Sequence, residues 1–367
     1  MPHTQPSLRS RVLFIDLLKT VSAQLIVLHH LAWYGPFGDH PFGPIFDGLL
    51  DWLSEYGRYA VAVFITTSGF LSAQLLSYRG LSPGHTPLCL IRQRYFRLVL
   101  PFAVALGFAV AADLLLRQWS PGDDVLGARP QWLQFVAHLF LLHGLLGFES
   151  LSAGVWYVAI EFQLYALLVL LLWLGQSLNR RPARADFLPA VLVLAMALAS
   201  LLHFNRDAAW DNTGFYFFGA YALGIASGWA IRSERRWQIL WLIGIAGALA
   251  LWIDFRPRIL VAVLTALALG CSRLHMARQE SRAIHYLGGT SYALFLIHYP
   301  VYVVVGAVFQ RIAPETTLHA VWGLGFAWLF SMACADMFHR WVELPLERLR
   351  KRRLACLQSS VQPAAAR

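Results

Sequence analysis

The sequence carries little charge for its length. Only 14% of its 367 residues are Asp, Glu, Lys or Arg, and 58% are hydrophobic, whereas soluble domains contain roughly 25% charged residues. A soluble globular domain is therefore excluded. Uninterrupted apolar runs near the bilayer-spanning length of about 20 residues recur along the chain and indicate an integral membrane protein.

The apolar runs also lack the two-residue alternation that a membrane β-strand requires. Long Leu, Ala and Val stretches satisfy their backbone groups in lipid as helices, so we expect an all-α, polytopic membrane protein. No repeat of fixed period, long linker or appended soluble domain interrupts the pattern. We therefore expect one integral-membrane domain over residues 11–347, with cytoplasmic tails at 1–10 and 348–367.

Cysteine is scarce, and several familiar motifs are absent. The four cysteines show no CxxC or Cys/His ligand spacing, so we expect no disulfide and no metal site. The net charge of +10 falls in short arginine clusters between apolar runs, which argues against a nucleic-acid partner. The first run lacks a small-residue cleavage site, so it reads as a retained helix and not as a signal peptide.

Eleven apolar segments are candidate spans, and the positive-inside rule tests which of them cross. Segment 132–148 is short and carries His138 and His143. If it crossed, the basic loop Arg180–Arg184 would face outward, so we expect a re-entrant or interfacial helix here. About ten transmembrane helices with both termini cytoplasmic then follow. The segments are approximately 12–34, 59–78, 96–116, 132–148, 155–175, 187–204, 213–231, 236–253, 258–273, 284–310 and 318–341.

Charged and polar groups within a span are costly and therefore mark functional sites. Lys19 and His30 in the first segment are eleven residues apart, which returns to within about 20° of the same helix face, roughly 16 Å higher. His29 lies about 80° away from Lys19 and is less suited to share a pathway with it. Because the segment enters from the cytoplasm, His30 should lie in the outer half of the membrane.

Glu161 is the matching carboxylate in segment 155–175. It lies near the outer end of a helix that runs inward, at a depth similar to that of His30. A carboxylate that orients an imidazole and stabilises its protonated form is suited to general-base chemistry, so we predict a His30–Glu161 dyad. An interhelical hydrogen bond that only joins two helices is the alternative.

Three arginines open the third helix. Arg92, Arg94 and Arg97 are spaced to share a helix face and to clamp phosphates. The positive-inside rule alone accounts for basic residues at an inner helix end, and Lys19 could equally extend its amine to the interface.

Two further intramembrane features remain open between a structural and a functional role. The pair Ser68-Gly69 favours close helix packing or a kink; no Gly-x-Ser-x-Gly elbow supports a serine nucleophile. His298 precedes Pro300, where the interrupted helix ladder favours a cavity, although a packed histidine fits as well.

Six segments in one order resemble the integral-membrane acyltransferases known as acyltransferase family three, over about residues 11–350. Each motif is weak alone, but their order is specific. The first helix matches as a basic residue, ten intervening positions and a histidine. The six segments are FIDLLKTVSAQLIVLHH, FITTSGFL, RYFR, WYVAIEFQLY, SYALFLIHYP and FHRWVELP.

The resemblance implies transfer of an acyl group, commonly acetyl from acetyl-CoA, to a hydroxyl or amine on a saccharide, lipid-linked glycan or other small acceptor. Acyl-CoA would be a co-substrate, with no permanently bound cofactor, and the protein would lie in the bacterial inner membrane. The catalytic histidine of the family falls on His30; the pairing with Glu161 rests on membrane depth alone. Donor-binding positions fall on Lys19, Arg94 and Arg97. Candidate pocket residues are Asp16, Ser68, Trp156, Tyr157 and His298.

The chain departs from the family pattern in two places. Lys19 stands where the first-helix arginine is usual, which keeps the charge but loses the bidentate fork. Tyr157 and Phe162 replace the usual serine and second glutamate of the Trp-Ser-x-x-x-Glu-Glu block. A transporter or flippase with a His/Glu relay is the alternative function, and a sensor or assembly subunit that binds a lipid or glycan without turnover is a third.

Overall fold

The structure is a computed structural model that describes residues 8–34, 43–82, 86–119, 129–178, 187–272, 281–312 and 316–361, with side chains for 13–352 of these. Its secondary structure is helical throughout the described part. The helices are α1 (Leu8–Trp33), α2 (Pro44–Tyr56), η1 (Gly57–Tyr59), α3 (Ala60–Leu75), α4 (Pro87–Trp119), α5 (Trp132–Leu139), α6 (Trp156–Leu178), α7 (Leu188–Leu202), η3 (Phe204–Arg206), η4 (Ala208–Trp210), α8 (Gly214–Ala230), α9 (Arg236–Ile253), α10 (Pro257–Cys271), α11 (Arg282–Ile312), α12 (Thr317–Phe338), the π-helical turn η5 (His339–Glu343) and α13 (Leu344–Val361).

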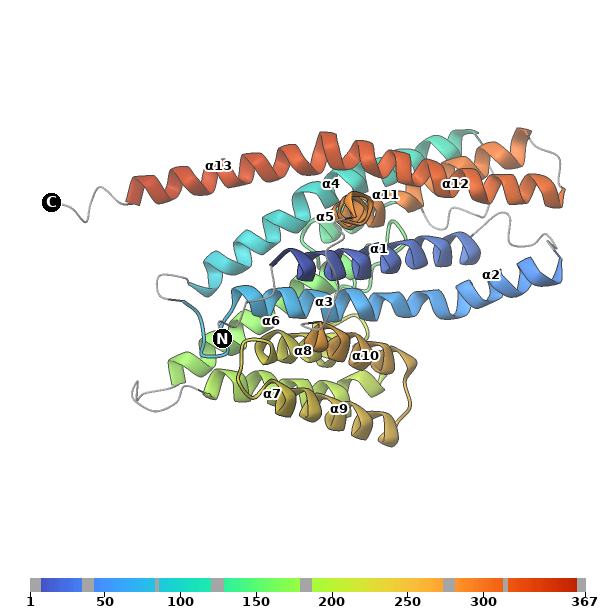
Figure 1. Ribbon diagram of the computed structural model, residues 1–367. Coiled ribbons are helices and arrows are strands. Elements are labelled where there is room, and N and C mark those ends of the chain that lie inside the picture. Colours follow the sequence, from blue (N-terminus) through green and yellow to red (C-terminus); the bar gives the residue numbers. More distant parts are fainter. Residues whose placement is uncertain are drawn as a thin grey trace.

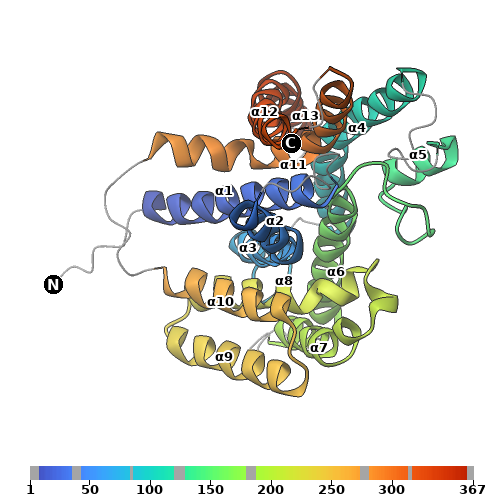
Figure 2. The same ribbon diagram turned by 90° about the vertical axis from the view of Figure 1, so that its right-hand side faces the viewer.

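The helices form one bundle whose order is the same in two views (Figures 1 and 2). From one edge to the other lie α12 and α13, then α11, α1, α3, the pair α8 and α10, and finally α7 and α9. Helices α4 and α6 lie along one side of this series, to the right in Figure 2. Segments at opposite ends of the chain are thereby adjacent, because α1 packs between α3 and α11.

The closest helix packing joins α3 and α8. A Cβ on Gly224 would lie 1.9 Å from the backbone oxygen of Thr66, and a Cβ on Gly69 would lie 2.0 Å from the backbone oxygen of Tyr221. Small residues that allow backbones to approach are the usual interface of membrane helices, because lipid supplies no hydrophobic drive for association. The predicted packing role of Ser68-Gly69 is confirmed for its glycine.

Among the described residues, seven helical segments are long and apolar enough to cross a bilayer; they lie on α1, α4, α6, α7, α9, α11 and α12. The protein is therefore an all-helical integral membrane protein. Helices α3, α8 and α10 have 16, 17 and 15 residues, shorter than the roughly 20 that a span normally needs. Ten spans require these three to cross as well, so the number ten stays a prediction.

Segment 132–148 forms a short helix followed by turns. The eight residues of α5 rise about 12 Å, well short of a hydrocarbon core of about 30 Å, so α5 alone does not cross. The rings of His138 and His143 stack at 3.9 Å. Burial, and then the neighbouring His138, lower the pKa of the His143 imidazole to about 3, so this ring is neutral near pH 7.

Two helices lie where the sequence suggested a loop and a tail. The stretch between the first two predicted spans, 12–34 and 59–78, contains α2, whose Pro44 fits the first helical turn because that position needs no backbone donor. The basic tail expected at 348–367 begins inside α13, which continues from α12 through η5. The Arg180–Arg184 cluster, which decided the predicted topology, lies outside the described residues.

Candidate active site

Two cavities in the described part of the bundle contain predicted site residues. One, of about 230 Å³, is here named the histidine cavity; among the residues that line it are His29, His30, Arg58, Trp156 and Arg258. The other, of about 470 Å³, is named the basic cavity; its lining includes Lys19, Ser68, Arg94, Arg97, Glu161, Glu343, Glu347 and Arg350. Most of the predicted site residues therefore line one of two spaces.

His30 is hydrogen-bonded to another histidine. Its Nδ1 lies 2.7 Å from Nε2 of His298, and the two rings are nearly parallel, at an interplanar angle of 4°. Nδ1 of His298 donates to the carbonyl of Leu294 at 3.0 Å. A neutral His298 therefore presents an unprotonated Nε2, so Nδ1 of His30 is the donor and Nε2 of His30 carries the lone pair.

The predicted His30–Glu161 contact is wrong. Glu161 Oε1 is paired with the guanidinium of Arg94 and accepts the hydroxyl of Ser68 at 2.5 Å, while its Oε2 accepts the Tyr157 hydroxyl at 3.3 Å. Although His30 and Glu161 were expected at a similar depth in the membrane, their side chains line different cavities. Glu161 faces the basic cavity. The residue beside His30 is His298, in the position that was predicted for Glu161.

In the basic cavity, several positively charged side chains form no ion pair with a carboxylate of the described residues. Its three carboxylates are bonded already, because Glu161 pairs with Arg94, Glu343 with His339 at 2.8 Å and Glu347 with Lys351 at 2.7 Å. Among the described residues, no ion pair joins Lys19, Arg97 or Arg350 to a carboxylate. Three positive groups without a direct counter-charge therefore face one cavity, which suits a ligand with several negative charges.

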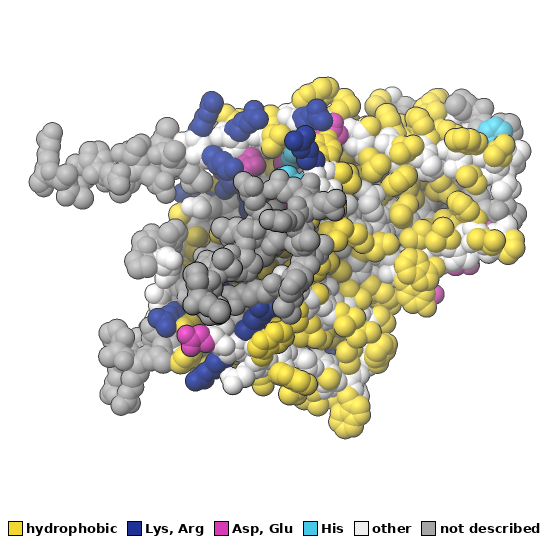
Figure 3. Space-filling model, in the orientation of Figure 1, with side chains coloured by type: hydrophobic (Ala, Val, Ile, Leu, Met, Phe, Trp, Pro, Cys, Tyr) yellow, Lys and Arg dark blue, Asp and Glu magenta, His cyan; other side chains and the backbone are white. Residues whose placement is uncertain are grey.

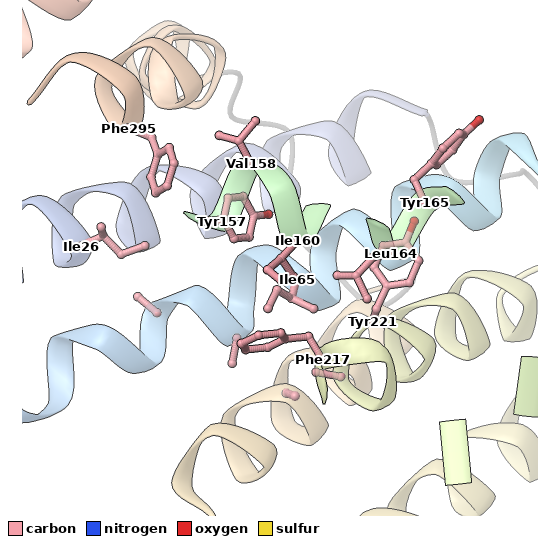
Figure 4. Close-up of a cluster of buried hydrophobic side chains, with 14 of the residues drawn as sticks. Ile26, Ile65, Tyr157, Val158, Ile160, Leu164, Tyr165, Phe217, Tyr221 and Phe295 are labelled. Carbon is pink, nitrogen blue, oxygen red and sulfur yellow. The ribbon is translucent and has the colours of Figure 1, made fainter. Parts of the chain in front are cut away.

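Tyr157 and Phe295 line both cavities. Their rings meet edge to face at 5.3 Å, and Figure 4 shows Phe295 of α11 beside Tyr157 of α6. The Tyr157 hydroxyl points to Glu161 in the basic cavity, whereas Phe295 lies against Gly154, where an added Cβ would come 3.4 Å from Cε1 of His30. This aromatic pair forms the wall between the cavities.

The remaining predicted pocket residues divide between the cavities and the bundle core. Trp156 lines the histidine cavity. Asp16 lines neither cavity and accepts a hydrogen bond from Nδ1 of His285 at 2.8 Å, so it joins α1 to α11. His29 lines the histidine cavity beside His30, whereas Lys19 lines the basic cavity.

Sequence reasoning missed three arginines that line the cavities. Arg350 belongs to a cluster interpreted as a basic tail, and nothing in its sequence context shows that η5 turns α13 toward the basic cavity. Arg58 follows a glycine just before the predicted segment 59–78, and Arg258 follows a proline as the first residue of the predicted segment 258–273; neither was selected as a site residue. Their proximity depends on α3 and α10 packing together, for which the sequence holds no signal.

The buried imidazole and its two cavities define a helical membrane protein with a site for group transfer. Residues 12–336, nearly the whole chain, match the family described as an acyltransferase domain. The chain belongs to this family, acyltransferase family three, as its six sequence motifs suggested, and is a membrane acyltransferase. Comparison with curated proteins and with solved structures found no match.

Proposed function

We propose that the chain transfers an acyl group, most simply acetyl, from cytoplasmic acyl-CoA to a hydroxyl of a saccharide, glycolipid or other envelope acceptor. The basic cavity would hold the CoA phosphates through Lys19, Arg97 and Arg350. Arg94, already paired with Glu161, would contribute to the same positive field. Both termini would be cytoplasmic, which puts this cavity on the donor side.

The pantetheine arm would extend from the basic cavity toward His30. Tyr157 and Phe295 close that route here, so their rings must turn aside for the thioester to pass. His30 lies beyond them, in the cavity that would hold the acceptor. Keeping donor and acceptor in separate spaces until the rings move would limit hydrolysis of the thioester.

His30 Nε2 would act as the general base. It would take the proton of the acceptor hydroxyl as the oxygen attacks the thioester carbon. The new carbon–oxygen bond forms, the carbon–sulfur bond breaks, and the imidazolium returns the proton to the departing CoA thiolate. Glu161 would act on the donor side, holding Arg94 and the Tyr157 hydroxyl, and not as partner of the base.

One observation carries this proposal. The hydrogen bonds from Leu294 through His298 to His30 leave a lone pair on Nε2 of His30, in the histidine cavity next to the basic cavity.

The experiment measures acyl transfer and donor binding separately. The His30→Ala variant is expected to insert in the membrane, to bind acetyl-CoA normally and to lose transfer, by about a hundredfold or more, as removal of a general base predicts. The Arg97→Gln variant is expected to weaken acetyl-CoA binding. Radiolabelled acetyl-CoA and an envelope extract from cells lacking the chain provide the assay.

His203→Ala is the matched control, because this exposed histidine ends α7 outside both cavities. It should transfer as the wild type does. Normal turnover by His30→Ala would remove His30 from the mechanism. A wild-type protein that neither binds acetyl-CoA nor yields an acylated product would instead support a transporter.

A further inference from the structure

The charged side chains that line the histidine cavity are positive. Two arginines, Arg58 and Arg258, line it together with two histidines, and among the described residues no aspartate or glutamate belongs to its lining. The basic cavity, by contrast, contains three glutamates among its cations. A cavity lined by cations without carboxylates favours an anionic occupant.

The two arginines have donors that protein groups leave unused. Arg258 gives one N–H to the Tyr216 hydroxyl at 2.7 Å, and its guanidinium lies 5.2 Å from the centre of that ring. Arg58 lies over the ring of Tyr59. An arginine has five N–H donors, and in the described part of the chain no carboxylate forms an ion pair with either residue.

A neighbouring carboxylate is engaged elsewhere. Asp254 lies 3.5 Å from both Arg206 and Arg256, so it balances those two arginines. Arg256 also donates to the side-chain oxygen of Asn205 and to the carbonyl of Leu201. These contacts hold Arg256 away from any ligand, whereas Arg258 keeps its remaining donors toward the histidine cavity.

Aromatic rings form much of the rest of the wall. Trp156 stacks on Phe217 with ring centres 5.7 Å apart, and Figure 4 shows Phe217, Tyr157 and Phe295 facing the same region from three helices. A sugar ring has C–H faces that pack on aromatic rings and a polar edge that forms hydrogen bonds. At about 230 Å³, below the usual 300–1,000 Å³ of small-molecule sites, the cavity suits one ring of a larger acceptor.

We propose that the acceptor is an acidic saccharide, whose carboxylate or phosphate binds Arg258 and Arg58 while a hydroxyl of the same sugar unit faces His30 Nε2. This inference rests on the proposed acyl transfer and specifies its acceptor. The planar fork of arginine binds carboxylate and phosphate oxygens in pairs, so the anion fixes which hydroxyl meets the base.

The test uses the full-length purified protein with radiolabelled acetyl-CoA. Envelope glycans and glycolipids from cells lacking the chain are separated on an anion exchanger into a neutral and an acidic pool. Label should enter the acidic pool. Carboxyl reduction of that pool should abolish labelling if the anion is a carboxylate, and phosphate removal should abolish it if the anion is a phosphate.

Substitutions connect that preference to the two arginines. Arg258→Gln and Arg58→Gln should each lower kcat/KM for the acidic pool about tenfold, as expected for loss of a hydrogen bond to a charged group, with KM for acetyl-CoA unchanged. Arg258→Lys should fall between the wild type and Arg258→Gln. Arg206→Gln, which removes an arginine beside Asp254 and outside the cavity, is the control and should act as the wild type does.

Arg58 is exposed, so its substitution keeps the test decisive if Arg258→Gln fails to fold. Label that enters only the neutral pool would overturn the acidic acceptor but leave acyl transfer standing. Label that still enters the acidic pool after both chemical treatments would also overturn the acidic acceptor and leave acyl transfer standing. Absence of label from every pool would overturn the proposed function and this inference with it.

Discussion

At the scale of single residues, His30, the proposed base, is oriented by another histidine. His298 is 1% exposed and is fixed by its bond to the Leu294 carbonyl, so its Nε2 can accept a hydrogen bond from His30 while the His298 ring stays neutral. A carboxylate in its place would stabilise the imidazolium more strongly but would also add a buried negative charge. The proposed base thus depends on a second histidine for its tautomer.

We predict that His298→Leu lowers kcat about tenfold or more and leaves KM for acetyl-CoA unchanged. Loss of the acceptor lets His30 rotate or change tautomer, and a hydrogen bond of about 1.4 kcal/mol corresponds to a tenfold change in rate. Steady-state kinetics with labelled acetyl-CoA provide the measurement.

His298→Gln is the informative companion, because its amide oxygen can accept a hydrogen bond near the position of Nε2. It should recover most of the rate lost in His298→Leu. Equal rates for both variants and the wild type would show that His298 only fills space.

At the scale of elements, the contact of α3 with α8 positions both cavities. α3 contributes Ser68 to the basic cavity and Ala62 and Ile65 to the histidine cavity, while α8 contributes Phe217 and Ala220 to the latter. Helix α8 is buried on nearly all its faces, as expected for the centre of a bundle. A change in the α3–α8 spacing would therefore alter the site.

We predict that Gly224→Ala destabilises the protein by about 1–3 kcal/mol, the usual cost of overpacking. The added Cβ would lie 1.9 Å from the backbone oxygen of Thr66, and a backbone atom cannot move aside as a flexible side chain can. Thermal unfolding of the protein in detergent, followed by tryptophan fluorescence, measures the effect as a lower Tm.

Gly244→Ala in α9 is the matched control, since nothing lies within 4 Å of a Cβ built there. It should leave Tm unchanged or raise it slightly, because alanine favours a helix over glycine. Equal Tm values for the two variants would show that the bundle can spread at α3 and α8 without cost.

At the scale of the whole molecule, positively charged side chains gather toward one end of the bundle. On the face shown in Figure 3, Lys and Arg side chains gather at the left, the direction in which α13 extends in Figure 1, while hydrophobic side chains cover much of the rest. From the positive-inside rule we expect the basic end to be cytoplasmic. The basic cavity, with Arg350 of α13 in its lining, would then face the compartment that contains the proposed CoA donor.

We predict that a reporter fused at about residue 182 reads cytoplasmic and one fused at about residue 207 reads outward. This result follows if α5 does not cross, because α6 then runs inward and α7 outward. Fusions to green fluorescent protein, which is fluorescent inside, and to alkaline phosphatase, which is active outside, provide paired measurements. Reversed readings at the two sites would mean that segment 132–148 spans the membrane.

The sequence by itself determined the class of protein. Apolar runs without alternation allow only helices in lipid, so the all-α membrane fold could be predicted from composition and run length. Motif order identified the family, and His30 and Lys19 could be chosen because polar groups within a span are costly. The inferences about class and fold hold because they depend on solvent and helix geometry, which act locally along the chain, whereas the roles of His30 and Lys19 stay predictions.

Only the tertiary structure decided which polar groups meet. The bond between His30 and His298 joins residues 268 positions apart, and depth in the membrane fixes neither the rotation of a helix nor its neighbour. The sequence accordingly paired His30 with Glu161, whereas the packing of α1 against α11 brings His298 to it, and α4 brings Arg94 to Glu161. The two cavities, and the aromatic wall between them, exist only once that packing is set.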